Sequence, residues 1–195
     1  MNQPSDEANH SKLVHPLTLE QAREVLLAIK GHPLWILVYL ALTTGQRPGE
    51  LLVLTWQDID FEHAFLTPQR TLVPGSPGQF REARVKAGAH NRRVPLRPGI
   101  LAALQTYREM QQRQREQVET RWYNHDSLFG TVTRAQMYPD DDLFEGLQQL
   151  LKQAGLPGWS LHHFRQSVAT WVFTQGMSLE EIQAALDENE RGPAV

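Results

Sequence analysis

The chain has 195 residues, a hydrophobic content of 41% and a formal net charge of −3. This length and composition are ordinary for one globular domain with its own core and are marginal for two. The chain contains no cysteine, which excludes a disulfide framework and a thiolate metal site.

The sequence carries no sign of a membrane span or a signal peptide. The longest apolar run, residues 34–42, is much shorter than the roughly 20 residues that cross a bilayer. Residues 1–12 are polar and acidic and lack the basic and apolar regions of a signal peptide. We therefore expect a cytoplasmic protein without a membrane partner.

Residues 1–16 are expected to form a flexible lead-in to one domain over residues 17–186. Thr18 and Gln21 have the spacing of a capping box, which predicts the start of a first helix. Gly31 is expected to stop that helix.

The second predicted helix covers residues 34–43, with Pro33 favourable as its first residue. Because this stretch is apolar nearly all round, we expect the helix to be central and buried. Gly45 breaks it, and a short third helix is predicted over residues 48–54.

A strand-rich stretch follows these helices. Residues 64–66 read as a short strand, and the prolines and glycines of residues 68–78 mark loops. Residues 83–86 and 92–96 are predicted to form a hairpin around a turn at residues 87–91.

The rest of the chain is predicted to be helical. The expected elements are a long helix from Pro98 whose polar part, 111–121, projects into solvent, a short extended piece at 127–130, helices at 142–153, between Ser160 and Gly176, and at 178–186, and a flexible tail at 187–195. Ser178 and Glu181 have the spacing of a second capping box, at the start of the last helix. The chain is therefore predicted to be mainly α, with a small antiparallel β-sheet or hairpin.

Charge is unevenly distributed along the sequence. One short stretch holds six basic residues against a single acidic one: Arg81, Arg84, Lys86, Arg92, Arg93 and Arg97, with Glu82. Such a stretch can present a basic face to a polyanion, and the alternative is a solvated basic hairpin.

Two short motifs each place an arginine where a loop turns into an apolar helix. The first is Thr44-Gly45-Gln46-Arg47-Pro48-Gly49-Glu50-Leu51, which continues to Leu54-Thr55-Trp56-Gln57-Asp58-Ile59-Asp60. The second is His162-His163-Phe164-Arg165. A planar guanidinium donates two parallel hydrogen bonds and stays charged, so two such groups can hold one phosphate.

At these motifs, and over about residues 17–186, the chain resembles the catalytic domain of the tyrosine recombinases, the phage integrase family. The first motif is similar to the family pattern T-G-x-R-x-G-E-L followed by L-x-W-x-D-I-D, and the second to H-x-x-R. The family's hairpin lysine, which precedes an R-x-V-P-L strand, is matched by Lys86 ahead of residues 93–96.

The resemblance implies roles for seven residues in binding and cleaving duplex DNA. Arg47 and Arg165 would grip the scissile phosphate, His162 would exchange a proton or donate to the phosphate, and Lys86 would protonate the leaving 5′ oxygen. Contacts to the DNA backbone would come from Arg84, Arg92 and Arg93. No metal or cofactor is implied, because the covalent protein–DNA link stores the bond energy.

Each of these residues also has a purely local interpretation. Arg47 can simply pair with Glu50, and Arg165 with an aspartate. His162 can be a capping or core histidine, and Lys86 a solvated charge of the hairpin. Gly45 and Gly49 are expected to allow close backbone packing around Arg47.

Two departures from the family pattern concern the end of the sequence. Where the family has L-G-H, whose His contacts the phosphate, this chain has Leu186-Asp187-Glu188, and the carboxylate of Glu188 at that position is expected to repel a phosphate. The nucleophilic tyrosine is expected beyond Val195, so we expect the 195 residues alone to be defective in cleavage.

The favoured function is therefore a DNA-binding integrase-type domain of a site-specific recombination system. The resemblance further implies a bacterial or phage-derived protein of the nucleoid that acts with other protomers, as a tetramer on DNA. The alternatives are a non-catalytic DNA-binding or regulatory protein, a decayed integrase remnant, and a helical protein-interaction module that uses the polar helix around residues 111–121.

Overall fold

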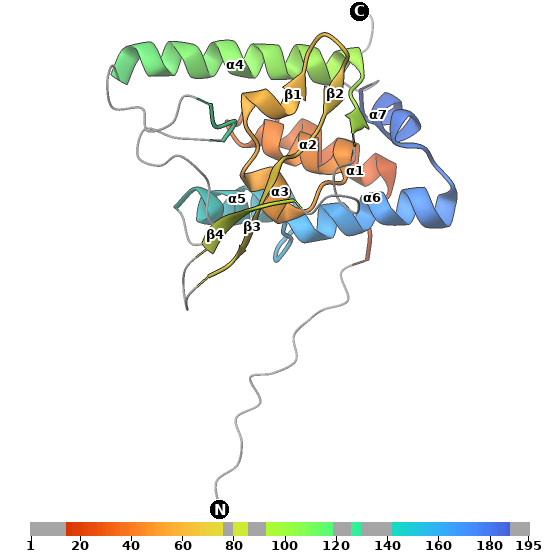
Figure 1. Cartoon of the computed structure of the whole chain (residues 1–195). Coiled ribbons are helices and arrows are strands. Elements are labelled where there is room, and N and C mark those ends of the chain that lie inside the picture. Colours follow the sequence, from red (N-terminus) through yellow and green to blue (C-terminus); the bar gives the residue numbers. More distant parts are fainter. Residues whose placement is uncertain (1–14, 76–79, 86–92, 119–125, 130–141, 188–195) are drawn as a thin grey trace, which may run out of the picture.

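The computed structural model describes residues 15–75, 80–85, 93–118, 126–129 and 142–187. These residues form a mainly helical structure with two small antiparallel sheets, which confirms the predicted fold class (Figure 1). The helices are α1 (Leu19–Ala28), α2 (Trp35–Thr44), α3 (Pro48–Leu52), a 3-10 turn (Trp56–Asp58), α4 (Pro98–Val118), α5 (Asp142–Gln153), α6 (Leu161–Gln175) and α7 (Leu179–Asp187). The strands are β1 (Ile59–Asp60), β2 (Phe65–Leu66), β3 (Arg70–Pro74), β4 (Phe80–Arg84) and β5 (Val94–Pro95).

Helix α2 is the centre of the core. Residues 36–44 are all buried, as their nearly uniform apolar character predicts. The helix packs against α1, α4, α6 and α7, and Figure 1 shows it between α4 and α6. Gly45 ends it in the left-handed conformation with φ of +59°. The loop that carries Arg47 therefore leaves the core from a fixed point.

The observed strand pairing differs from the predicted hairpin. Strand β4 pairs with β3, in a register that sets Arg70 opposite Arg84, and β5 pairs with β2, with Leu66 opposite Val94. The prediction that residues 83–86 and 92–96 pair as a hairpin was therefore wrong. Burial decides the pairing of β5, because Val94 and Leu66 both enter the core from this register.

Most helix boundaries follow local capping chemistry. The capping boxes at the starts of α1 and α7 are both present, as predicted. Helix α2 begins at Trp35 instead of Pro33, because the Leu34 N–H donates to Nδ1 of His32 at 3.1 Å and holds a turn before the helix. Helix α3 ends at Leu52, two residues earlier than predicted.

The polar part of α4 does not simply project into solvent. Gln111 is buried, and its Oε1 accepts a hydrogen bond from Trp56 Nε1 at 2.9 Å. Its Nε2 donates to the carbonyls of Ser127 and Leu128. The prediction of a solvent-exposed stretch was therefore wrong at Gln111, and residues 119–121 lie outside the described residues.

Leu17 joins the start of the described chain to α6. Its N–H donates to Ser167 Oγ at 3.0 Å, and its carbonyl accepts from Trp171 Nε1 at 2.8 Å. Ser167 and Trp171 are one turn apart on α6 and both are fully buried. In the part of the chain that is described, no helix is long and apolar enough to cross a membrane.

Candidate nucleic-acid interface

The two arginine motifs meet in space. The Arg165 guanidinium, on α6, donates from Nη1 to the carbonyl of Gly45 at 2.6 Å. Gly45 lies two residues before Arg47, so a side chain of the second motif contacts the backbone of the first across 120 residues of sequence. The half-buried Arg165 and the loop that carries Arg47 therefore lie next to each other.

Two glycines allow other elements to approach this loop closely. A Cβ added at Gly45 would lie 2.7 Å from Val168 Cγ1 of α6. A Cβ added at Gly49 would lie 2.8 Å from the Leu72 carbonyl and 2.9 Å from Thr71 Oγ1, both on β3. These distances are too short for a real side chain, which confirms that Gly45 and Gly49 permit close packing on both sides of Arg47.

Arg47 itself is held locally at its backbone and remains exposed. Its N–H donates to Oε2 of Glu50 at 3.2 Å, and its Nη1 lies 3.7 Å from Oε1 of the same carboxylate. The contact expected from the local interpretation is therefore present. The Glu50 side chain is 5% exposed and that of Arg47 44%, so the carboxylate is buried while the guanidinium still faces solvent.

The adjacent histidines at the start of α6 have different environments. His163 accepts the Ser160 N–H on Nδ1 at 2.9 Å and packs against Trp159, with ring centroids 5.4 Å apart. His162 is exposed, and its Nε2 lies 3.1 Å from Nε2 of Gln166 one turn further along. His162 and Arg165 are three residues apart on one helix, so they share a face, whereas His163 caps the helix.

The stability of the protein is expected to depend on pH through His163. Burial, with a smaller contribution from His162, lowers the pKa of His163 below its usual value. The stabilising contribution of the neutral ring is therefore complete above the unfolded-state pKa and is lost as the pH falls through the lower folded-state pKa. We expect the free energy of unfolding to fall on acidification from about pH 8 to about pH 5.

The matched variant for this expectation is His163→Gln. Glutamine at the third helical position can still accept the Ser160 N–H but does not titrate. Urea denaturation at several pH values should show a smaller acid-induced loss for the variant than for the natural chain. Identical pH profiles for the two proteins would remove His163 as a source of the dependence.

The structure describes some of the basic residues that are expected to contact DNA, and others lie outside the described residues. Arg84 is exposed at the end of β4. Arg93 lies over the Phe65 ring at 4.0 Å from its centroid, with Nη2 3.9 Å from Oδ2 of Asp60. Lys86 and Arg92 lie outside the described residues.

Of the two tyrosines in the described part of the chain, one is in the core and the other is partly buried against it. Tyr39 is fully buried on α2 and donates its hydroxyl to the Asp187 carboxylate. Burial raises the pKa of Tyr107 to about 12, which disfavours its phenolate. Tyr123 and Tyr138 lie outside the described residues.

Comparison with known proteins decides the family. The family model described as the Phage integrase family matches residues 16–189. The chain belongs to the phage integrase family.

Curated relatives of this integrase-family chain include the XerC-like tyrosine recombinase of Caldanaerobacter subterraneus subsp. tengcongensis. That protein is 28% identical over 177 residues, which are 86% of this chain and 45% of the relative. An integrase of Streptomyces ambofaciens is 26% identical over 176 residues, or 85% of this chain and 44% of the relative. The chain thus spans less than half the length of these relatives.

Solved structures with the same fold include the XerA recombinase and the Tn1549 transposon integrase in complex with a circular intermediate DNA. The first has a TM-score of 0.60 at 21% identity, over 95% of this chain and 58% of that one. The second has a TM-score of 0.66 at 20% identity, over 96% of this chain and 64% of that one. At this level of identity the two structures show a shared fold.

Asp187 precedes Glu188, the residue at the position of the family histidine, and is the last residue of α7. The Asp187 carboxylate accepts from Tyr39 and lies 3.7 Å from Nε of Arg97, with 17% of its side chain exposed. It is thus turned toward α2 and the start of α4. Glu188 lies outside the described residues.

Sequence reasoning overlooked Gln183, a fully buried amide on α7. It lies between Ile182 and Leu186, which are also buried, so it occupies the apolar face of the helix. The sequence did hold a signal for it, a polar residue at a position where helical spacing predicts the core. A polar group is buried only when it has hydrogen-bond partners, so such a residue indicates specific contacts.

Proposed function

We propose that the chain is the catalytic domain of a tyrosine recombinase that binds duplex DNA and serves site-specific recombination and integration. The observation that carries the proposal is the hydrogen bond from Arg165 to the Gly45 carbonyl, two residues before Arg47. Family membership supports the same reading, because the match covers both motifs. The domain that performs this function is residues 17–186, and its place in the cell is the nucleoid.

Phosphoryl transfer requires positioning and charge stabilisation more than covalent chemistry from the protein. Arg47 and Arg165 are assigned to the non-bridging oxygens of the scissile phosphate, because guanidinium groups donate bidentate hydrogen bonds to such oxygens. His162 is assigned to the same phosphate, since it shares the face of α6 that carries Arg165.

The remaining assignments come from the family pattern. Lys86 is the general acid for the leaving 5′ oxygen, and Arg84, Arg92 and Arg93 contact the DNA backbone without reading sequence. A tyrosine outside these 195 residues, or on another protomer of a tetramer, attacks the phosphate and forms a 3′-phosphotyrosyl link. The 195-residue chain therefore binds DNA without cleaving it.

The test measures binding and cleavage in the same reactions. We expect the affinity of the chain for a nicked duplex to fall steeply as salt rises from about 50 to about 200 mM, because bound cations release counterions from the phosphates. No DNA-linked protein band should form on a denaturing gel. Absence of binding at the low salt concentration contradicts the function, and a covalent band contradicts the assignment of the nucleophile.

The non-catalytic alternative is tested by complementation. Adding a C-terminal fragment that carries the family tyrosine should restore cleavage if the phosphate-binding residues are competent. Salt-dependent binding without restored cleavage favours a regulatory DNA-binding protein instead.

A further inference from the structure

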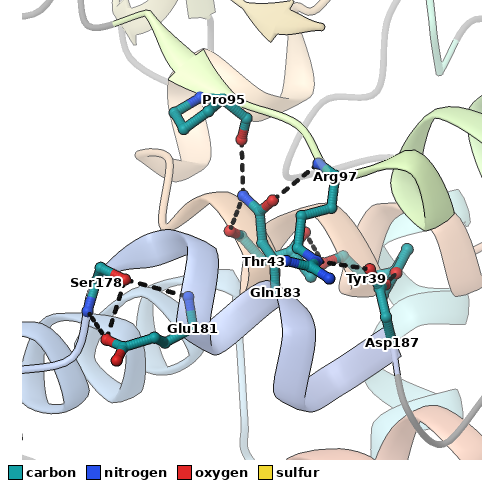
Figure 2. Close-up of polar contacts among 8 residues, drawn as sticks. All are labelled: Tyr39, Thr43, Pro95, Arg97, Ser178, Glu181, Gln183 and Asp187. Atoms are coloured by element: carbon teal, nitrogen blue, oxygen red, sulfur yellow. Dashed lines mark hydrogen bonds and ion pairs between the residues drawn. The ribbon is translucent and has the colours of Figure 1, made fainter.

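We propose that Gln183 is a positioning residue for the DNA-binding site, an inference that rests on the proposed function. Its amide makes three hydrogen bonds to backbone groups of two other segments (Figure 2). Nε2 donates to the carbonyls of Thr43 at 3.1 Å and of Pro95 at 2.8 Å. Oε1 accepts the Arg97 N–H at 3.0 Å.

The two carbonyls belong to the segments that carry the basic residues of the site. Thr43 is in the last turn of α2, four residues before Arg47. Pro95 ends β5, two residues after Arg93. One side chain from α7 therefore connects two segments that are about fifty residues apart in sequence and that each bring cations to the interface.

Glutamine is suited to this position by both length and hydrogen-bonding capacity. Its primary amide supplies two donors and an acceptor, and both donors and the acceptor are used. Glutamate of the same shape has no donor when ionised, and methionine has neither a donor nor a strong acceptor. Since Gln183 is fully buried, water does not replace a lost partner, and an unpaired carbonyl is costly.

A second contact one turn later fixes α7 to the same two segments. Asp187 accepts from Tyr39 on α2 and lies beside Arg97 at the start of α4, as Figure 2 shows. The start of α4 also packs closely against Asp187, because a Cβ added at Gly99 would lie 2.9 Å from the Asp187 carboxylate. Helix α7 is thus held to α2 and to the β5–α4 junction at two points.

Gln183 is expected to fix the distance between the basic residues that the two segments carry. Phosphate recognition by two groups of cations requires a fixed separation between the segments that carry them, because misplacement weakens several contacts together. Without Gln183, the hydrogen-bonded bridge from the junction after β5, through α7, to Thr43 at the end of α2 is lost. DNA affinity should then fall while the fold, which is held by the core around α2, is retained.

The experiment compares two substitutions at Gln183 with the same substitutions at an exposed glutamine. Gln183→Met and Gln183→Glu are each expected to bind the nicked duplex about tenfold more weakly than the natural chain at about pH 8. The controls are Gln153→Met and Gln153→Glu, since Gln153 is exposed at the end of α5. The glutamate control reproduces the added negative charge without touching the three hydrogen bonds.

The pH dependence tests whether restoring one donor at residue 183 restores DNA affinity. A buried carboxyl beside two carbonyls has a raised pKa, and its protonated form regains one donor. The Gln183→Glu variant is therefore also tested at about pH 5.5, where its affinity should recover toward that of Gln153→Glu. Gln183→Met should show no recovery relative to Gln153→Met.

A distance measurement on the same variants makes the inference testable without DNA. The chain has no cysteine, so spin labels can be attached at single cysteines that replace the exposed Gln105 on α4 and Glu180 on α7. Loss of the Gln183 amide should broaden the distance distribution between these labels in pulsed EPR. The folded fraction is followed by circular dichroism, and if Gln183→Met does not fold, Gln183→Glu at the two pH values carries the comparison.

Each outcome has a defined meaning. If the natural chain binds DNA and the Gln183 variants bind equally well, the positioning role is wrong. If the natural chain fails to bind DNA, the proposed function is wrong, and an unchanged label distance in the variants removes the positioning role as well. The positioning role is supported if the variants bind DNA more weakly, their distance distribution between the labels is broader, and the affinity of Gln183→Glu recovers in acid.

Discussion

Replacing Gly45 with alanine is expected to lower the free energy of unfolding by about 3 kcal/mol. A left-handed backbone, with φ of +59° at this residue, costs roughly 1–2 kcal/mol for a residue with a Cβ. The added Cβ also lies 2.7 Å from Val168 Cγ1, and Val168 is buried in α6. Moving a packed side chain in a core typically costs about 1–3 kcal/mol more.

Gly176→Ala is the matched control for this expectation. Gly176 also has a positive φ, +71°, but an added Cβ meets nothing within 4 Å. Urea denaturation should therefore show a loss of only about 1–2 kcal/mol for this variant. Val168→Ala in the Gly45→Ala background should recover part of the loss, because it removes the contacting methyl groups. Equal losses for Gly45→Ala and Gly176→Ala would contradict the close approach of α6 to the Arg47 loop.

Replacing Arg165 with alanine is expected to weaken DNA binding about 100-fold, which corresponds to ~2.7 kcal/mol. The substitution removes a charged group proposed to contact the phosphate and also the donor to the Gly45 carbonyl at 2.6 Å. Arg165→Lys keeps the charge but not the planar fork, so it should recover only part of the affinity. Filter binding or fluorescence anisotropy at fixed salt provides the measurement.

Arg113→Ala is the control for loss of a positive charge. Arg113 is on α4, with 77% of its side chain exposed and Nη2 3.9 Å from Glu109. It should change the affinity little, because its charge lies outside the proposed site. Stability measured in parallel separates the loss of the Gly45 contact from the loss of phosphate binding. An Arg165→Ala variant that binds DNA like Arg113→Ala would exclude Arg165 from the interface.

Local chemistry explains what could be predicted from the sequence. The starts of α1 and α7 depend on hydrogen bonds between residues three apart, so their capping boxes were visible in the sequence. The buried character of α2 follows from its composition alone. The expectation that Gly45 and Gly49 permit close packing was also correct, because the flanking motif had already indicated an arginine held between elements.

Contacts between distant segments could not be predicted in the same way. The pairing of β5 with β2 depends on which register buries Val94 against Leu66, and turn signals do not encode it. The contact of Asp187 with Tyr39 was not predicted either, because the two residues are 148 positions apart in the sequence. The three bonds of Gln183 likewise join segments whose proximity only the folded chain establishes.

The attachment of Leu17 to α6 has a mechanical consequence. Both backbone polar groups of Leu17 are hydrogen-bonded to side chains of the helix that also carries His162 and Arg165. Tension applied to the chain ahead of Leu17 is therefore expected to reach α6 through these two hydrogen bonds. A tether or fused protein on that side would thus pull on the helix that carries the proposed phosphate-binding Arg165.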